Sequence, residues 1–366
     1  MGTIPTRFFK ESKNNHRIYV PFCCKDPNSN SDVSNWIECF NPSNKSWHRV
    51  TSIPGLPENH VLKGFSMVSI GDFIYIIGGR LCLKKRTRDD PPPDDDDGVA
   101  VEETDVGILQ SVLKYDVYRD TWMKAAPMNV ARFDFACTVC KNKIFIAGGQ
   151  STLGSAKGIS SAEVYDPILD RWSFLPRMSS LRYKCVGVTY QGKVLVVGGF
   201  AEKDDSEIDS SPGPFNMERS SAEVFDCQMQ RWDYKAMMWK LDIPPNQIVC
   251  VNNSLFSSGD CLNAWKGHLE VYDRNLNMWD IVKGSTLENL LYCPWRRLYL
   301  TMAPVGTHLY FLAGYKIPGE ISRIRTEVHV FDTSENGFGW KSFEPIEEEG
   351  EEKEISCHSC VVQQDY

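Results

Sequence analysis

Apolar runs of four residues, each followed by a pair of glycines, occur three times in the chain. The runs occupy residues 74–77, 144–147 and 194–197, and the glycines follow at 78–79, 148–149 and 198–199. A short continuous apolar run that is bounded by turn signals is typical of a β-strand covered on both faces. The pattern therefore predicts buried strands that end in turns, where glycine permits a positive φ angle.

The same signals follow these glycine pairs in the same order. Downstream of the second pair, Ala-Glu-Val-Tyr-Asp stands at 162–166 and Arg-Trp at 171–172. Downstream of the third pair, Ala-Glu-Val-Phe-Asp stands at 222–226 and Arg-Trp at 231–232. An aspartate after an aromatic residue predicts a turn, because its carboxylate can accept a hydrogen bond from its own backbone two residues on. The chain is therefore built from repeats.

Six tryptophans occupy the same place in successive repeats: Trp47, Trp122, Trp172, Trp232, Trp279 and Trp340. They are 47 to 75 residues apart, so loops of different length extend a unit of about fifty residues. Each unit predicts four short antiparallel strands. The first follows an arginine, the second ends in the glycines, the third carries the aromatic residue and aspartate, and the fourth carries the tryptophan. Such units are typical of the blades of a β-propeller.

The first repeat has a second, a third and a fourth strand but lacks a first one. The segment at 355–362 resembles the missing strand. If it joins the first repeat, the ring closes and few strand edges stay exposed. The sequence therefore predicts an all-β fold, a six-bladed propeller closed by the C-terminal strand. It would occupy residues 18–366 as one domain, after an N-terminal tail at 1–17.

The third and fourth repeats resemble the kelch-repeat superfamily, which includes galactose oxidase. The resemblance rests on Ala-Glu-Val-Tyr-Asp-Pro at 162–167, Arg-Trp at 171–172 and Leu-Pro-Arg-Met at 175–178, which look like plant F-box/kelch-repeat proteins. It implies a kelch β-propeller that recognises substrates for ubiquitin ligation. Seventeen residues precede the first predicted strand, too few for the helical F-box. We therefore expect any recruitment to a ligase to occur through another subunit.

Two charged segments stand outside the repeat. Residues 84–105 combine lysine and arginine with an aspartate-rich and proline-rich run at 89–97. A run so polar cannot bury enough apolar surface to become ordered, and it predicts a disordered insertion between the second and third strands of the second repeat. A second acidic segment at 344–354 predicts a loop before the closing strand.

Composition narrows the possible partners. A formal charge of −8 and a pI near 5.5 argue against general binding to nucleic acid or anionic membranes, which need a basic surface. No signal peptide and no run of eighteen apolar residues is visible, and the 13 cysteines stand mostly in apolar strand runs. This use of cysteine is typical of a reducing compartment. We expect a monomer in the cytoplasm, the nucleus or both, with a protein or peptide ligand.

The candidate partner-binding residues are basic. Arg132, Arg182 and Arg297 stand at equivalent positions ahead of the second strand, and Lys63 is close to the matching place in the second repeat. In an antiparallel blade these positions lie on one face near the axis, where related families place ligand-binding arginines. The alternative is that these arginines bond to backbone carbonyls in turns and between blades.

Motifs for chemistry are absent from the sequence. Cys357 and Cys360 form a C-x-x-C near the predicted partners Cys23 and Cys24, but residues three apart in a strand point to opposite faces, so we predict core packing and no metal site. The seven histidines are scattered, and no phosphate-binding loop or nucleophile elbow occurs. We predict a non-enzymatic protein-interaction module without a cofactor. The alternative is a kelch-type enzyme or small-molecule binder with a pocket at the propeller axis.

Overall fold

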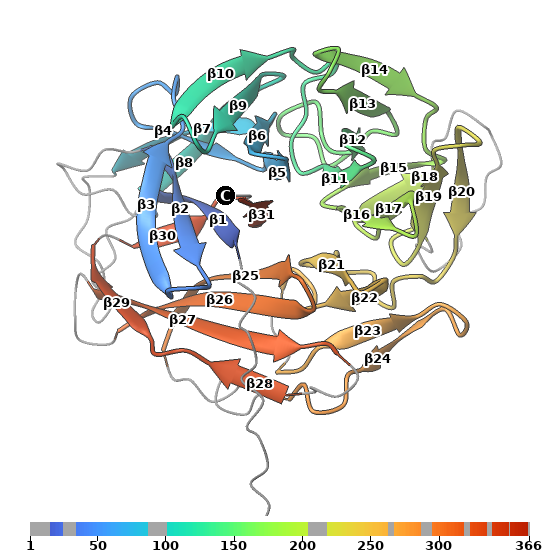
Figure 1. Ribbon diagram of the computed structural model, residues 1–366. Helices are drawn as coiled ribbons and strands as arrows, with labels where there is room; N and C mark the ends of the chain where they lie inside the picture. Colours follow the sequence, from blue (N-terminus) through green and yellow to red (C-terminus); the bar gives the residue numbers. More distant parts are fainter. Residues whose placement is uncertain are drawn as a thin grey trace, which may run out of the picture.

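The predicted all-β fold is confirmed. The computed structural model describes residues 15–24, 34–86, 101–203, 218–262, 267–286, 295–317, 323–334, 339–350 and 352–364. These residues contain strands, turns and loops but no helix, and hence no helix of the length and hydrophobicity that a bilayer crossing requires. Their strands form eight sheets, of which six have four or five strands. The larger sheets stand around a common centre, with β31 beside it (Figure 1).

Within each larger sheet, neighbouring strands pair antiparallel. The first two sheets contain β1 (His16–Cys24), β2 (Asn35–Asn41), β3 (Ser46–Ser52), β30 (Lys353–Ile355) and β31 (Cys360–Gln363), and then β5 (Ser66–Ile70), β6 (Phe73–Ile77), β9 (Val112–Asp116) and β10 (Thr121–Ala125). The next two contain β11 (Ala136–Cys140), β12 (Lys143–Ala147), β13 (Ala162–Asp166) and β14 (Arg171–Leu175), and then β16 (Val186–Tyr190), β17 (Lys193–Val197), β19 (Ala222–Asp226) and β20 (Arg231–Lys235).

The last two larger sheets contain β21 (Ile248–Val251), β22 (Ser254–Ser257), β23 (Glu270–Asp273) and β24 (Met278–Ile281), and then β25 (Arg297–Val305), β26 (His308–Lys316), β27 (Arg323–Asp332), β28 (Gly339–Ser342) and β29 (Ile346–Glu349). The two small sheets contain β4 (His60–Lys63), β7 (Arg80–Arg86) and β8 (Val101–Ile108), and β15 (Ser180–Tyr183) with β18 (Phe200–Lys203).

The innermost strands of the six larger sheets are neighbours in a cyclic order. That order is β5, β11, β16, β21, β25, β31 and again β5. The C-terminal segment at 355–362, expected to be one strand, contains the end of β30 and most of β31. Both strands pair antiparallel with β1, with Phe22 opposite Ile355 and Tyr19 opposite Cys360. Strands from the two ends of the chain therefore share one sheet.

The repeat signals have the expected local roles. Asp116 and Asp166 each accept hydrogen bonds from backbone N–H groups two and three residues on, and equivalent bonds form at Asp226 and Asp273. These contacts start the turn between the third and fourth strands. The aspartate in this position is therefore structural.

Two charged segments differ from expectation. The sequence predicted disorder at 84–105, but residues 84–86 belong to β7 and 101–105 to β8, and Lys84 stands opposite Glu103. Residues 87–100, including the acidic run, lie outside the described residues. The segment at 344–354, expected to be a loop, contains β29 and the start of β30. Pairing with a neighbouring strand stabilises polar segments that have no apolar pattern of their own.

The glycine pair makes room for backbone from neighbouring segments and not for the tryptophan ring. Gly148 and Gly149 do have positive φ angles, 70° and 93°. A Cβ atom on Gly148 would lie 2.6 Å from the carbonyl oxygen of Arg182, and the N–H of Gly149 donates to that oxygen at 2.7 Å. The glycines therefore admit the backbone that enters the next sheet.

Trp172 instead fills the space between two sheets. Its ring centroid lies 5.1 Å from that of Tyr165, and its Nε1 donates to the carbonyl oxygen of Ala126 at 2.9 Å. Tyr75 of the preceding sheet belongs to the same apolar cluster. Since the side chain is only 5% exposed, it contributes mainly through burial.

We expect Trp172→Ala to lower the free energy of unfolding by about 3 to 5 kcal/mol, because it leaves a large cavity between sheets. Phe174 on the same strand is 62% exposed, and Phe174→Ala is the matched control, with an expected change below about 0.5 kcal/mol. Denaturant unfolding measures both. A loss below about 1 kcal/mol for Trp172→Ala would contradict its burial.

Candidate functional site

Arg132 and Arg182 are buried inside the sheets. Both are 0% exposed. Arg132 donates to the carbonyl oxygens of Gly148 at 2.8 Å and Ser161 at 2.9 Å, and its Nη2 lies 2.7 Å from the Glu163 carboxylate. Arg182 donates to the carbonyl oxygen of Gly198 at 3.0 Å. The prediction that these two arginines face a partner is therefore wrong, and the alternative of backbone-bonded arginines describes them.

Each buried arginine faces a buried glutamate. Glu163 also accepts hydrogen bonds from the backbone N–H groups of Asn129 and Val130, at 2.8 and 3.2 Å. Burial lowers the pKa of the Arg132 guanidinium, while the Glu163 carboxylate acts in the opposite direction. The carboxylate thus joins the third strand to the link from the preceding sheet. Glu223 does the same for Arg182, with a separation of 3.5 Å, and for the N–H groups at 179 and 180.

Other repeats have different residues at the place of Glu163, which stands opposite Ile146 of the second strand. In chain order, the residues at this place of the third strand are Glu38, Leu113, Glu163, Glu223, Glu270 and His329. Glu38 binds Lys353 of β30 at 2.6 Å. Glu270 binds Lys240, and Ile243 stands where Arg132 would be. Sequence reasoning missed these glutamates, although Ala-Glu-Val occurs in two repeats.

Lys63 and Arg297 do not complete a basic ring. The matching place for Arg132 in the second repeat is Leu62, one residue before Lys63, as shown by the pairing of Lys63 with Arg80 and of Phe133 with Gln150. The Lys63 ammonium lies 2.5 Å from Glu103 and 2.8 Å from Glu354. Arg297 begins β25 and is exposed. Of the four predicted residues, Arg297 is the one whose side chain is exposed enough to contact a partner.

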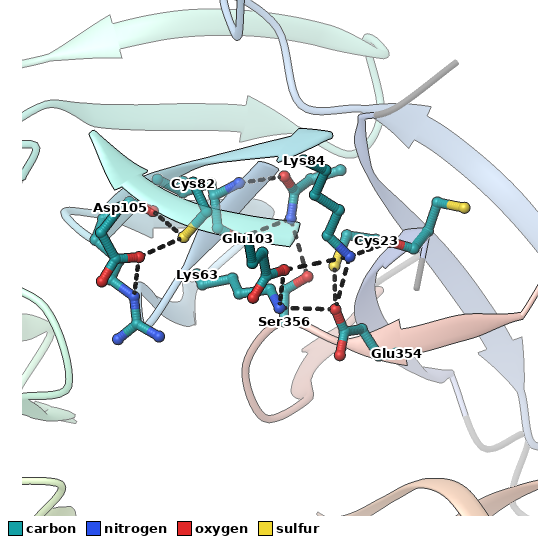
Figure 2. A network of polar contacts seen from close by, with 12 residues as sticks. Cys23, Lys63, Cys82, Lys84, Glu103, Asp105, Glu354 and Ser356 are labelled. Carbon is teal, nitrogen blue, oxygen red and sulfur yellow. Dashed lines mark hydrogen bonds and ion pairs between the residues drawn. The ribbon is translucent and has the colours of Figure 1, made fainter. Parts of the chain in front are cut away.

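Lys63 belongs to a polar network that joins the sheet of β4, β7 and β8 to β1 and β30 (Figure 2). Glu354 of β30 is its centre, with Oε1 at 2.8 Å from Lys63 Nζ and 3.0 Å from Lys84 Nζ. Lys84 is 4% exposed and also donates to the carbonyl oxygen of Cys24 at 2.6 Å. The hairpin of β7 and β8 is therefore fixed to β1 and β30.

The charges in this network keep Glu354 and Lys63 ionised and keep the Cys23 thiol protonated. Burial alone would raise the pKa of the Glu354 carboxyl, but the Lys63 and Lys84 ammonium groups hold it below its usual range. Burial alone would lower the pKa of Lys63, but Glu103 and Glu354 raise it. Burial and the nearby Glu354 raise the pKa of the Cys23 thiol to about 12. The thiol is therefore protonated at neutral pH and is a poor nucleophile.

The network continues toward the third sheet through Asp105. Its carboxylate accepts a bond from the Cys82 thiol at 3.1 Å and lies 3.0 Å from Arg80 Nε. The Arg80 guanidinium lies 3.5 Å from Asp134 and 5.0 Å from the centre of the Phe133 ring. Side chains from the first sheet, from the sheet of β4, β7 and β8 and from the segment that leads to β11 therefore meet.

A cavity of about 630 Å³ runs along the inner strands. Its polar lining includes Asp134, Lys184, Asn246 and His358, and its thiols include Cys357. Nε2 of His358 lies 2.7 Å from the carbonyl oxygen of Asn246. Burial lowers the histidine pKa, so the ring is neutral at pH 7 and Nε2 is the donor. Among the described residues, no three histidine, cysteine or acidic side chains are grouped to hold a metal ion.

Comparison with known proteins agrees with the repeat and with its geometry. The family profile of the Kelch motif matches residues 131–179, which contain Arg132, Glu163 and the glycine pair. The chain therefore contains a Kelch motif and is similar to kelch-repeat proteins. An F-box/kelch-repeat protein of Arabidopsis thaliana, At1g16250, is 30% identical to it over 176 residues, which are 47% of this chain and 42% of that protein.

Two further relatives extend the kelch resemblance. The F-box/kelch-repeat protein SKIP30 of Arabidopsis thaliana is 23% identical over 320 residues, covering 86% of this chain and 76% of the relative. The human Kelch repeat and BTB domain-containing protein 12 is 26% identical over 186 residues, covering 48% of this chain and 27% of the relative. The match spans less than half the length of At1g16250 and of two other F-box/kelch-repeat proteins of Arabidopsis thaliana, At1g67480 and At5g26960.

We expect the network to weaken in acid. Because the pKa of Glu354 is lowered on folding, its contribution is present above the ordinary glutamate pKa of about 4.3 and is lost as the pH falls through the lower folded value. Near neutral pH, Glu354→Gln should lower the free energy of unfolding by about 1.5 to 3 kcal/mol.

The difference between wild type and Glu354→Gln should shrink as unfolding is measured at pH values falling from about 5 to about 3. Glu58→Gln, at an exposed position, is the control and should change stability little. A difference that stays constant over this pH range would show that Glu354 is not an ionised partner of the two lysines.

Proposed function

We propose that this protein is a non-enzymatic protein-interaction module that recognises a substrate for ubiquitin ligation and meets the ligase through another subunit. The observation that carries the proposal is the kelch match together with relatives whose names combine kelch repeats with an F-box or a BTB domain. The position of the ion-paired hairpin supports it, because a fixed projection beside the axis gives a partner a defined surface.

The proposed architecture is a six-bladed propeller closed by the C-terminal strand. The cyclic order of the inner strands supports it, as does the pairing of β31 with β1. Closure would place the loops between second and third strands on one face. We propose that the partner binds there and that Arg297 contacts it, since this arginine is exposed whereas Arg132 and Arg182 are buried.

The axial cavity favours a second candidate, a small-molecule binder or kelch-type enzyme. Its volume of about 630 Å³ lies within the range of ligand sites, about 300 to 1,000 Å³. Asp134 and His358 line it. However, Asp134 faces Arg80, and His358 is bonded to the backbone. These contacts indicate that Asp134 and His358 have structural roles in the cavity wall, and they do not favour a reaction centre.

We further propose that the protein acts as a monomer in the cytoplasm or nucleus. The support for the compartment is the state of its cysteines, because the twelve within the described residues are free thiols. Free thiols are the usual state in a reducing compartment. Imaging of a tagged chain and sedimentation of the purified protein test the two parts of this proposal separately.

Affinity purification of the tagged full chain, followed by mass spectrometry, tests the proposed function. We expect a ubiquitin-ligase subunit and a second protein whose ubiquitination falls when this chain is removed. Arg297→Glu should weaken capture of the second protein without changing the melting temperature. Retention of that protein by Arg297→Glu would exclude Arg297 from the interface, and the absence of any ligase subunit would contradict the link to ubiquitination.

A chain that ends at Gly350 tests closure, because it lacks β30 and β31. Loss of these two strands exposes the edges of β1 and of the neighbouring sheets. We therefore expect the truncated chain to aggregate and to lose its captured proteins. A monomeric truncated chain with an unchanged melting temperature would contradict closure by the C-terminal strand.

A further inference from the structure

β8 is an edge strand that projects outside the larger sheets. It ends the sheet of order β4, β7, β8, and among the described residues no further strand pairs with it. It has eight residues, whereas the outer strands of the larger sheets, β3, β10, β14, β20, β24 and β28, have four to seven. The backbone N–H and C=O groups along an unpaired edge can pair with another extended chain.

One face of β8 is used to hold the strand in place. Glu103 lies 2.5 Å from Lys63 and 3.4 Å from Lys84, and Asp105 lies 3.0 Å from Arg80. Figure 2 shows the contacts of Glu103 and Asp105, with Glu103 beside Glu354 of β30 and Asp105 farther from it. Because these contacts fix the orientation of β8, an incoming strand would meet a rigid edge and lose little free energy in ordering it.

The opposite face of β8 is accessible. Side chains alternate along a strand, so Glu102 and Thr104 point away from the face that carries Glu103 and Asp105. Both are exposed. Val106, where the pairing with β7 shifts register, is 45% exposed. The free edge therefore presents acidic, hydroxyl and apolar side chains in sequence.

The charges of β8 decide between two occupants. Antiparallel pairing of β8 with β8 of a second copy would bring Glu102 near its own equivalent, and like charges across strands are unfavourable. Glu103 and Asp105 are already paired with Lys63, Lys84 and Arg80. A strand with lysine or arginine at alternate positions would form opposite-charge pairs instead. The acidic edge therefore disfavours a second copy and favours a basic segment of another protein.

We propose that β8 binds an extended, basic segment of a partner protein by strand addition. Backbone hydrogen bonds along the edge supply affinity, and Glu102 selects lysine or arginine on the exposed face. This inference rests on the proposed function as a protein-interaction module and identifies one surface of that module. It does not involve Arg297, so the two surfaces can be tested separately.

The direct probe is a fluorescein-labelled, end-capped heptapeptide with lysine at odd positions and valine or threonine between them. We expect it to bind the full chain, and we expect a peptide with glutamate in place of lysine to bind at least about fivefold more weakly. Hydrogen exchange should slow at the amides of residues 101–108 when the lysine peptide binds, because strand addition protects the edge.

Glu102→Lys should weaken binding of the lysine peptide about fivefold or more. Glu202→Lys, an exposed glutamate on β18, is the matched control and should leave binding unchanged. The proposal is overturned if the lysine peptide fails to bind, if it binds without protection of 101–108, or if Glu102→Lys has no effect. A wild-type dimer in which residues 101–108 are protected from exchange without peptide would overturn it in favour of a second copy.

The same variant separates this inference from the proposed function. If the partner captured from cells remains bound to Glu102→Lys but is lost with Arg297→Glu, the protein is an interaction module and β8 is not its docking edge. If the peptide results hold and no ligase subunit is captured, the edge binds a basic segment in a protein with a different role.

Discussion

Buried carboxylates on the third strands hold this propeller-like fold together. Glu163 and Glu223 face Arg132 and Arg182, and Glu38 faces Lys353. In each case the cation comes from the segment beside the innermost strand, so the ion pair connects the axis to the middle of the sheet. Removing one partner of such a pair leaves an uncompensated charge in the interior, which typically costs about 3 to 5 kcal/mol. The position of the inner strands therefore depends on these contacts.

The same contacts decide which surfaces remain for a partner. Cations that neutralise buried glutamates cannot also bind a ligand, so the basic face expected from the sequence is reduced to Arg297. Lys63 does not add to such a basic face, because the network around Glu354 pairs Lys63 and Lys84 with carboxylates. Specificity must then come from shape and from strand edges as much as from positive charge. The acidic edge of β8 is the clearest such surface.

Local patterns predicted the elements well, because each depends on one short segment. The aspartate turns, the positive φ of Gly148 and the strand character of the C-terminal segment follow from nearest neighbours in sequence. Contacts between distant segments were less predictable. The burial of Arg132 requires Glu163 on another strand, and the contact of Trp172 with Ala126 requires the preceding sheet. The ordered ends of the segment at 84–105 also depend on pairing that its composition does not reveal.

The second repeat supplies the comparison that tests the role of the buried pairs. It has Leu62 and Leu113 at the positions of Arg132 and Glu163, and Leu113 packs against the apolar cluster that contains Leu62. The most direct measurement is the free energy of unfolding of Arg132→Leu, Glu163→Leu and the double variant. Each single change should cost about 3 to 5 kcal/mol, and the double variant should recover most of that loss. A single Arg132→Leu with wild-type stability would contradict an internal role for the arginine.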